Sequence, residues 1–437
     1  MRAADDADRL LPRWAGGAVG DVVLYAVSAV LAAGLAAVTI YHGHRVWGLC
    51  SVAAYLGGAV ATLAVRAGGA ATHRNRMAIA AGVFAVSALV PVVVLVVQRV
   101  HGVPWSAQPE VDVVERMARL LLDTGTPYAD LDALGRAVDF RDYAPYLPAM
   151  AVLGIPGALT GDAGVAAALT DARLVFAAVA AGLVLLTLRL LRGSGATSPL
   201  PVRAVQLVAV LPATTLTLAT GGDDLPVLAL LVLAIAGSHL GRPGLAGVAG
   251  GVALAMKLTA APVLLVLAIA MARSPARAGG RRVAVFVGSV VAVAAALVLP
   301  SLLVAPAALV EHVIGFPAGL TGVESPAASP LPGYLLAQTG EAGRMVALAA
   351  LAVAAVAILV WVLRRPPRTA AEAAERAAAG LVVAMLLMPS TRYGYLVYPL
   401  VLTGSAIALR SLGSFAMRNE LGENAGAGRG TGAPAAE

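Results

Sequence analysis

The run GLAGVAGGVALAMKLTAAPVLLVLAIAMA, residues 244–272, decides how the chain is threaded and therefore which fold it can adopt. It is 29 residues long, and Lys257 is its only charged residue. A single helix of this length would cross a bilayer with residues to spare, because about 20 residues suffice. Lys257 and Pro262 interrupt the middle of the run, and a proline breaks helical hydrogen bonding. The run can therefore form either one long span or two short limbs.

The arginines that follow this run favour two limbs. Cytoplasmic loops of membrane proteins carry an excess of Lys and Arg. A single span would leave the arginines of residues 273–282 on the side opposite to every other strong basic cluster, whereas two limbs return them to the same side. We therefore expect a two-limbed hairpin with Lys257 at the outer side of the membrane.

The rest of the chain indicates an all-α, polytopic membrane protein. Hydrophobic residues make up 59% of the chain, charged residues make up 13%, and the mean hydropathy is +0.85, which no ordinary soluble domain reaches. Together with the two limbs and a crossing on either side of Pro389, the apolar runs give a bundle of about 12 helices. The run 146–159 is short and holds two prolines, so we expect it to be interfacial or re-entrant. The other runs are 21–40, 46–65, 77–97, 171–191, 202–219, 225–240, 283–304 and 345–361.

This threading divides the chain into three parts. Residues 1–20 are expected to form a cytoplasmic N-terminal segment, residues 21–411 the membrane domain, and residues 412–437 a disordered cytoplasmic tail. Two outer loops interrupt the membrane domain. An amphipathic, acidic loop at 98–145 follows the third span, and a Pro/Gly-rich loop at 305–342 has the length and composition of a lid over a site. We expect a multi-pass protein of the cell membrane.

The net charge of +7 does not indicate a nucleic-acid partner. The arginines lie in short clusters between apolar runs, as the orientation of membrane helices requires, so membrane lipids are the expected surroundings. Cys50 is the only cysteine, which excludes a disulfide within the chain. No His/Cys cluster has the spacing of a transition-metal site, and we expect no cofactor. The pair Asp223 and Asp224 is the one place that suggests a divalent cation.

The acidic loop carries the first candidates for chemistry. Residues 98–143 hold eight of the 24 acidic residues of the chain. Within them, PEVDVVERMARLLLDT at 109–124 has apolar residues at helical spacing behind a proline, which predicts an amphipathic helix on the membrane surface. Glu110 and Asp112 in its first turn can serve as a general base, or they can merely complement the positive helix N-terminus. Glu115 can pair with Arg119 one turn later.

Four segments, in order along the chain, share the pattern of one enzyme family. The acidic loop contributes Glu110, the residues 111–114, Ala118 and GTPY at 125–128. The other segments are DYAPYLP at 142–148, AMKLTAAP at 255–262 and MPSTRYGYLVYP at 388–399. In these elements the chain resembles glycosyltransferase family 87, the polyprenyl-phosphate-mannose-dependent mannosyltransferases of the GT-C membrane superfamily. The family's acidic residue is usually Asp where this chain has Glu110, and its Tyr is replaced by Val114.

The resemblance implies a GT-C-like bundle that transfers a sugar, most simply mannose, from a polyprenyl phosphate to a glycan or glycolipid acceptor. The transfer would take place on the extracytoplasmic side with inversion, and Glu110 would act as the general base. Asp112 and the pair Asp223/Asp224 compete for that role. In TLATGGDDLP this pair also has the pattern of a helix N-cap with a charged first turn.

The leaving phosphate needs cations close to the membrane surface. Lys257 and Arg392 are the natural candidates, and His312 is a third. Each also has a plainer explanation: Lys257 can extend its ammonium to the interface, Arg392 can belong to an aromatic belt, and His312 can be solvated in its loop. Aromatic side chains beside these elements are candidates for substrate contacts, namely Tyr128, Tyr143, Tyr146, Tyr393 and Tyr395.

A transporter or lipid flippase is the alternative function, because about 12 helices with Gly and Pro breaks also fit that class. A non-catalytic lipid-binding relative is a third possibility. Transporters are typically built from two related halves with charges near the membrane midplane. This chain shows no obvious halves, and its threading collects the polar residues at one face, which favours the enzyme.

Overall fold

The computed structural model describes residues 17–161, 164–194, 198–273 and 279–427. Within these ranges the chain is helical apart from its loops and one isolated bridge between Ala328 and Thr391. The prediction of an all-α polytopic membrane protein is therefore confirmed. Among the described residues, eight helical segments are long and apolar enough to cross a bilayer: Gly17–Val38, His42–Ala67, His73–Val100, Ala172–Gly193, Val202–Thr220, Gly279–Val304, Glu341–Arg364 and Tyr393–Leu412.

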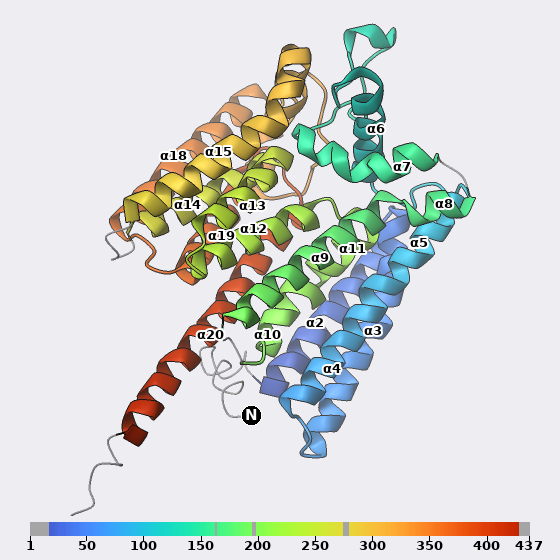
Figure 1. The fold of residues 1–437 in the computed structure, drawn as a ribbon. Helices are drawn as coiled ribbons and strands as arrows, with labels where there is room; N and C mark the ends of the chain where they lie inside the picture. The colour runs from blue at the N-terminus through green and yellow to red at the C-terminus, as the bar shows by residue number, and fades with distance from the viewer. Residues whose placement is uncertain (1–16, 162–163, 195–197, 274–278, 428–437) are drawn as a thin grey trace, which may run out of the picture.

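The N-terminal half forms one side of the molecule (Figure 1). Helices α2 (Gly17–Val38) and α3 (His42–Ala67) pack against each other through small residues, since a Cβ on Gly48 would lie 2.8 Å from the Ala32 carbonyl oxygen. The third crossing contains a π-helical turn, Ala85–Leu89, two residues before Pro91, which cannot donate a backbone hydrogen bond. The rest of this crossing consists of α4 (His73–Phe84) and α5 (Val90–Val100). After the acidic loop and its short helices, this half continues with α8 (Gly164–Leu169), α9 (Ala172–Gly193), α10 (Val202–Val205), the π turn Gln206–Val210 and α11 (Pro212–Thr220).

A buried polar cluster fastens three of these helices together. The Asp21 carboxylate of α2 accepts hydrogen bonds from Arg76 of α4 at 2.6 Å and from the Gln206 amide at 3.0 Å, and Arg203 of α10 lies 3.4 Å away. Asp21 is almost completely buried. Breaking a buried ion pair leaves an uncompensated charge, so the cluster fixes the mutual positions of α2, α4 and α10.

The run 244–272 forms two limbs, as expected. Helix α13 (Pro243–Met256) ends at Lys257, whose backbone is extended, and α14 (Ala261–Ala272) follows a short 3₁₀ turn, Leu258–Ala260. Pro243 at the start of α13 and Met271 at the end of α14 line the same cavity, so the chain turns back at Lys257. The neighbouring helices are α12 (Asp224–His239) and α15 (Gly279–Val304).

The helix directions give the bundle two distinct ends. We call the end that holds Lys257 the site end and the other the far end. Helices α12 and α14 run from the site end to the far end, and α13 and α15 run back, since Gly247 and Gly251 of α13 pack in parallel on Phe286 and Val293 of α15. The basic clusters that follow or precede the spans collect at the far end, as the threading predicted: Arg66, Arg74, Arg76, Arg192, Arg203, Arg242, Arg273, Arg281, Arg282 and Arg368.

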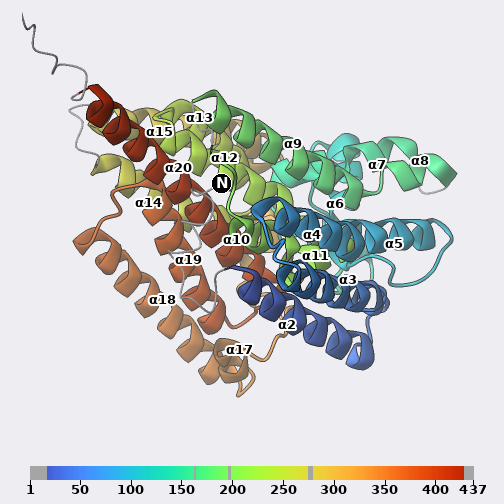
Figure 2. The ribbon, with the colours of Figure 1, turned by 90° about the horizontal axis from the view of Figure 1, so that it is seen from below.

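The C-terminal helices cover the other side of the molecule. Helix α19 (Ala370–Leu387) packs on α14 and on α18 (Glu341–Arg364), and Figure 2 shows this group apart from α2 to α5. Helix α20 (Val397–Ala427) runs past residue 412, so the segment 412–427, which we expected to be disordered, is helical. Residues 1–16 and 428–437 lie outside the described residues. The short elements are α16 (Pro306–Val310), the π turn Glu311–Gly315, α17 (Pro332–Ala337) and the 3₁₀ turn Tyr393–Leu396.

The amphipathic helix predicted in the acidic loop is α6 (Pro109–Thr124), and it begins at the proline. Its apolar face, which includes Val114 and Met117, is fully buried. That face packs on the 3₁₀ segment Pro148–Gly154 and on α7 (Ile155–Thr160), and not on lipid as we had expected. The contact is close because a Cβ on Gly154 would lie 2.4 Å from the Val114 carbonyl oxygen. The run 146–159 is thus a short supporting element that holds α6 in place.

We expect Gly154→Ala to destabilise the protein by about 1–3 kcal/mol, because the new methyl group meets backbone that cannot move without shifting α6. Thermal unfolding of the detergent-solubilised protein measures the effect. Gly182→Ala is the matched control, since open space surrounds Gly182 in α9 and Ala favours a helix over Gly. Equal melting temperatures for the two variants would contradict the close packing of α6.

Candidate active site

Lys257 lies at the centre of a buried ionic cluster at the site end. Its ammonium is 2.6 Å from the Asp223 carboxylate and 2.5 Å from the Asp224 carboxylate, and all three side chains are at most 10% exposed. The ammonium also lies 4.8 Å from the centre of the Tyr146 ring. Lys257 therefore does not extend freely to the interface, because two carboxylates and an aromatic face surround it.

Two glycines place the carboxylates in this cluster. Helix α11 ends at Thr220, and Gly222 then adopts a φ of +93°, which favours glycine over any residue with a side chain. The sharp turn sets Asp223 and Asp224 at the N-terminus of α12. Asp223 occupies the N-cap position, but its side chain makes no capping hydrogen bond and points to Lys257. The N-cap alternative for this pair therefore explains its position and not its contacts.

Helix α20 contributes a tyrosine that the sequence analysis did not select. The Tyr398 hydroxyl donates a hydrogen bond of 2.7 Å to the Asp224 carboxylate and accepts one of 3.1 Å from the Thr259 hydroxyl. The tyrosine is buried. Lys257 and Tyr398 thus bind the same oxygen of Asp224 from two different helices. The spacing of MPSTRYGYLVYP shows an aromatic segment, and nothing in it distinguishes Tyr398 from its neighbours.

Glu110 and Arg392 form the second ionic pair of the site end. The first turn of α6 carries Glu110, and its carboxylate contacts the Arg392 guanidinium. Glu110 is 13% exposed, and its second carboxylate oxygen is buried without a hydrogen-bond partner among the described residues. A buried oxygen that accepts no hydrogen bond is free to take a proton from a bound group. Asp223 also has a buried oxygen without a hydrogen-bond partner, but the Lys257 ammonium lies 2.6 Å from that same oxygen, whereas in Glu110 the arginine contacts the other oxygen.

Backbone contacts bring the two ionic groups to the same place. The Gln108 amide N–H, two residues before Glu110, donates to the Thr220 carbonyl at 2.8 Å, three residues before Asp223. The Gln108 side chain lies 3.3 Å from His44 at the start of α3. Tyr398, six residues after Arg392, donates its hydrogen bond of 2.7 Å to Asp224. Glu110 and Lys257 therefore share the site end, which the sequence analysis had expected.

Asp112 has a structural role. Its carboxylate is 2.6 Å from Arg99, and its side chain is 62% exposed. The same arginine binds Glu115 at 2.7 Å and Asp171 at 3.0 Å, so it links α5, α6 and the start of α9. The Glu115 carboxylate is thus taken by Arg99 and by the Ala172 N–H, and not by Arg119 alone as the helical spacing suggested. This network anchors α6 and lies apart from Lys257.

His312 is fully buried and supports the loops around the site. Its Nδ1 accepts a hydrogen bond of 2.9 Å from the Ala144 N–H, and its Nε2 is 3.0 Å from the Ala129 carbonyl, to which it donates. Both ring nitrogens are therefore engaged with backbone, and neither faces a ligand. The solvated alternative for His312 is wrong, and a phosphate contact would require the ring to leave this position.

The five candidate tyrosines fall into different environments. Tyr128 donates to the Tyr146 carbonyl at 2.9 Å, and Tyr143 stacks on Phe316 with ring centres 4.2 Å apart, so both are buried supports. Tyr146 lies beside the Lys257 ammonium, and Tyr395 lies in the 3₁₀ turn that follows Arg392. Tyr393 is 52% exposed, and its N–H donates to the Ser329 hydroxyl.

The Pro/Gly-rich loop packs beside Arg392. Ala327 and Ser329 exchange backbone hydrogen bonds of 2.9 Å with Thr391, the residue that precedes Arg392. The loop therefore fixes the segment that carries the arginine. Among the described residues, no three His, Cys, Asp or Glu side chains form a metal-binding group. Between Asp223 and Asp224 the Lys257 ammonium already holds the position that a divalent cation would need.

The pH dependence of stability tests the role of His312. Burial lowers the pKa of His312 below its ordinary value of 6.5, so the folded state favours the neutral ring. The neutral His312 ring therefore contributes fully to the free energy of unfolding above about pH 6.5. This contribution is lost as the pH falls below that value, because the unfolded state then binds the proton more readily than the folded state. We expect His312→Gln to reduce the loss of melting temperature between pH 7.5 and 5.5. His101→Gln, at an exposed histidine, is the control, and an unchanged loss in His312→Gln would contradict the assignment.

Comparison with known proteins assigns the chain to a family. The family model described as glycosyltransferase family 87 matches residues 144–389, more than half of the chain. The match contains Tyr146, Asp223, Asp224 and Lys257, and it ends before Arg392 and begins after Glu110. No curated protein and no solved structure matched the chain. With its polytopic helical fold and a paired set of buried acids and cations at one end, the chain belongs to glycosyltransferase family 87 and is a membrane glycosyltransferase.

Proposed function

We propose that the protein transfers mannose from a polyprenyl phosphate to a lipid-linked or cell-envelope glycan, with Glu110 as the general base. The observation that carries this proposal is the pairing of Glu110 with Arg392 beside the Lys257 cluster. The reaction needs a carboxylate that can accept a proton, and it needs cations nearby that can bind the phosphate. Both kinds of group lie at the site end: Glu110 pairs with Arg392, and Lys257 lies between Asp223 and Asp224.

The proposed step exchanges one glycosidic bond for another. The acceptor hydroxyl attacks the anomeric carbon, its proton passes to the free oxygen of Glu110, and a new C–O bond forms. The bond between the anomeric carbon and the phosphate oxygen breaks, and the electron pair leaves with the polyprenyl phosphate. Attack from the face opposite to the phosphate inverts the anomeric configuration. A positioned base of this kind contributes about 10² to 10⁴ in rate.

Glu110 and Arg392 form an ion pair in which their charges neutralise each other. A guanidinium binds a phosphate through two parallel N–H bonds, as it binds a carboxylate. A phosphate that takes over Arg392 would release Glu110, and the base would become available only when donor is bound. The buried second oxygen of Glu110 is then the proton acceptor. The contact between the proposed base and the proposed phosphate-binding arginine fits this exchange.

Lys257 is proposed as the second phosphate ligand. An isolated lysine in an apolar run costs roughly 3 kcal/mol on insertion scales, and a buried charge persists only with partners. Asp223 and Asp224 supply these partners, and Tyr398 fixes Asp224. Because the Lys257 ammonium provides the positive charge at this position, we propose that no divalent metal is required there.

The direction of transfer follows from the charge distribution. The basic clusters collect at the far end, and cytoplasmic ends of membrane helices carry the excess of Lys and Arg. We therefore propose that the far end is cytoplasmic and that the site end faces the extracytoplasmic side of the cell membrane. The acceptor would approach from that side, past the Pro/Gly-rich loop.

Glu110→Gln is the direct test of the base. We expect turnover to fall by about 10² to 10⁴. Donor affinity should be kept or increased, because the neutral amide competes less with phosphate for Arg392. The measurement uses purified protein, radiolabelled polyprenyl-phospho-mannose and a membrane lipid extract, with identification of the labelled product. Asp123→Asn, an exposed acid on the same helix α6, is the control and should behave as wild type.

Two outcomes of this test would overturn different parts of the proposal. Transfer by Glu110→Gln at the wild-type rate would exclude Glu110 as the base. A wild-type protein that ignores the mannosyl donor and uses another polyprenyl-linked sugar would exclude mannose and leave the base assignment standing.

Lys257→Met should weaken donor binding about tenfold or more, the value of a charge-assisted hydrogen bond. The substitution also leaves two carboxylates facing each other, which can distort the site. The double variant Lys257→Met/Asp223→Asn restores the net charge of the cluster without restoring the ammonium. Weak binding in both variants supports a phosphate contact. Recovery in the double variant, or unchanged affinity in the single variant, would contradict it.

A further inference from the structure

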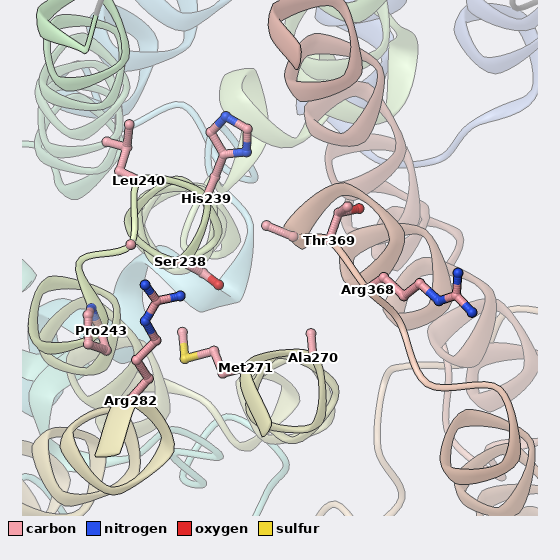
Figure 3. A pocket seen from close by; sticks show the side chains of 11 residues that line it. Ser238, His239, Leu240, Pro243, Ala270, Met271, Arg282, Arg368 and Thr369 are labelled. Atoms are coloured by element: carbon pink, nitrogen blue, oxygen red, sulfur yellow. The ribbon is translucent and has the colours of Figure 1, made fainter. Parts of the chain in front are cut away.

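A cavity of about 430 Å³ opens at the far end of the bundle (Figure 3). It is formed where α12 and α14 end and where α13, α15 and α19 begin. The whole lengths of α12 and α13 separate it from Lys257 at the site end. The cavity is therefore distinct from the proposed active site and is left unexplained by sugar transfer.

The lining of the cavity is cationic. Figure 3 shows the Arg282 side chain and the Ser238 hydroxyl pointing into the space between the helices, while the His239 ring and the Arg368 guanidinium lie at its edges and point away from it. The lining contains no carboxylate. Among the described residues Arg282 forms no hydrogen bond or ion pair, although it is only partly exposed. A guanidinium held in a half-buried position without a partner favours an anionic ligand.

The surrounding chain has no acid that could neutralise this charge. Residues 225–310 hold five arginines and Lys257 but no Asp or Glu. Helix α19, whose first residue lines the cavity, carries two acids, and both are already engaged. Glu372 accepts a hydrogen bond of 2.9 Å from the Arg368 N–H, and Glu375 lies 2.5 Å from Arg410. The excess of arginine at this end is what membrane orientation requires, but orientation alone does not place one arginine inside a cavity.

We propose that this cavity binds a phosphate group, and that the group is carried by the headgroup of an anionic phospholipid. Pro243 and Ala370, the first residues of α13 and α19, line the cavity, so the positive ends of two helices lie there, and Arg282 of α15 can bind two phosphate oxygens at once. Leu240, Ala270 and Met271 supply an apolar wall. Basic pockets between membrane helices on the cytoplasmic side are suited to such headgroups.

The apolar surfaces of the neighbouring helices favour a phospholipid as the source of the phosphate. Val248 of α13, Leu265 of α14 and Val285 of α15 are exposed apolar residues on the helices that border the cavity. In a membrane these residues contact acyl chains, so a phospholipid can place its tails along the helices while its headgroup enters the cavity. A soluble phosphate would gain nothing from these surfaces.

The test measures lipid binding and requires no sugar transfer. The full-length protein in detergent is titrated with phosphatidylglycerol or phosphatidylcholine, and bound lipid is counted by native mass spectrometry. We expect wild type to bind phosphatidylglycerol more tightly than phosphatidylcholine. Arg282→Gln should weaken phosphatidylglycerol binding about tenfold or more, since a hydrogen-bonded charge pair is lost. Arg281→Gln is the matched control, because Arg281 is exposed, adjacent and outside the lining.

Each outcome bears on the proposal. Equal binding by Arg282→Gln and Arg281→Gln, or equal affinity of wild type for the two lipids, would overturn it. In a separate arm, inorganic phosphate is added to the protein. Phosphate that binds wild type and does not bind Arg282→Gln supports the phosphate site. If phosphate also displaces the bound lipid, the two ligands share one position. Binding of inorganic phosphate without any preference for phosphatidylglycerol would overturn the lipid source. Arg282→Lys, which keeps the charge and loses the planar fork, should bind with intermediate affinity and guards against misfolding in Arg282→Gln.

Discussion

The positive charge of Lys257 in an otherwise apolar run is the constraint on which the rest of the structure depends. A charge in this environment must be paired, and the partners must come from other parts of the chain. The turn after α11 delivers Asp223 and Asp224, and α20 delivers Tyr398. The break between α13 and α14 lies at the same point, so one side chain fixes the hairpin, the start of α12 and the entry of the last helix.

Glu110 and Arg392 are a second pair of charges from distant parts of the chain, and they are less buried than the Lys257 cluster. Glu110 and Arg392 are 282 positions apart in the sequence, and they meet because α6 is anchored on one side and the Thr391 segment on the other. Arg99 binds Asp112 and Glu115 near the start of α6 and ties them to Asp171. The backbone of residues 327–329 holds Thr391. The polar network that surrounds the site is thus structural at its edges and leaves one carboxylate oxygen unused at its centre.

The sequence predicts what depends on local spacing and on membrane thickness. The apolar runs, the start of α6 at Pro109 and the two limbs around Lys257 follow from helical periodicity, proline chemistry and the distribution of arginine. The structure has a helix at each of these places, and eight of its described helical segments are long and apolar enough to cross a bilayer. Which acids and cations share an end of the bundle follows from the same threading.

Contacts between distant elements could not be read in this way. Helical spacing offered Arg119 to Glu115, and it could not show that the tertiary fold also places the Arg99 guanidinium 2.7 Å from this carboxylate. A histidine in a polar loop gave no sign that both its nitrogens would be used by backbone, as they are in His312. Tyr398 was hidden among similar tyrosines because its value depends on Asp224, which lies on another helix. Each of these residues was misjudged for the same reason, since its partner is set by packing and not by spacing.

The shortness of α13 and α14 has a consequence for the surrounding membrane. At about 1.5 Å per residue their 14 and 12 residues reach roughly 21 and 18 Å, less than a hydrocarbon core of about 30 Å. Val248 and Leu265 face outward on these limbs, so neighbouring lipids must compress to cover them. Hydrophobic mismatch of this kind costs a fraction of a kcal/mol for each ångström. Acyl-chain length in the host bilayer therefore acts directly on the two helices whose junction holds the buried ammonium.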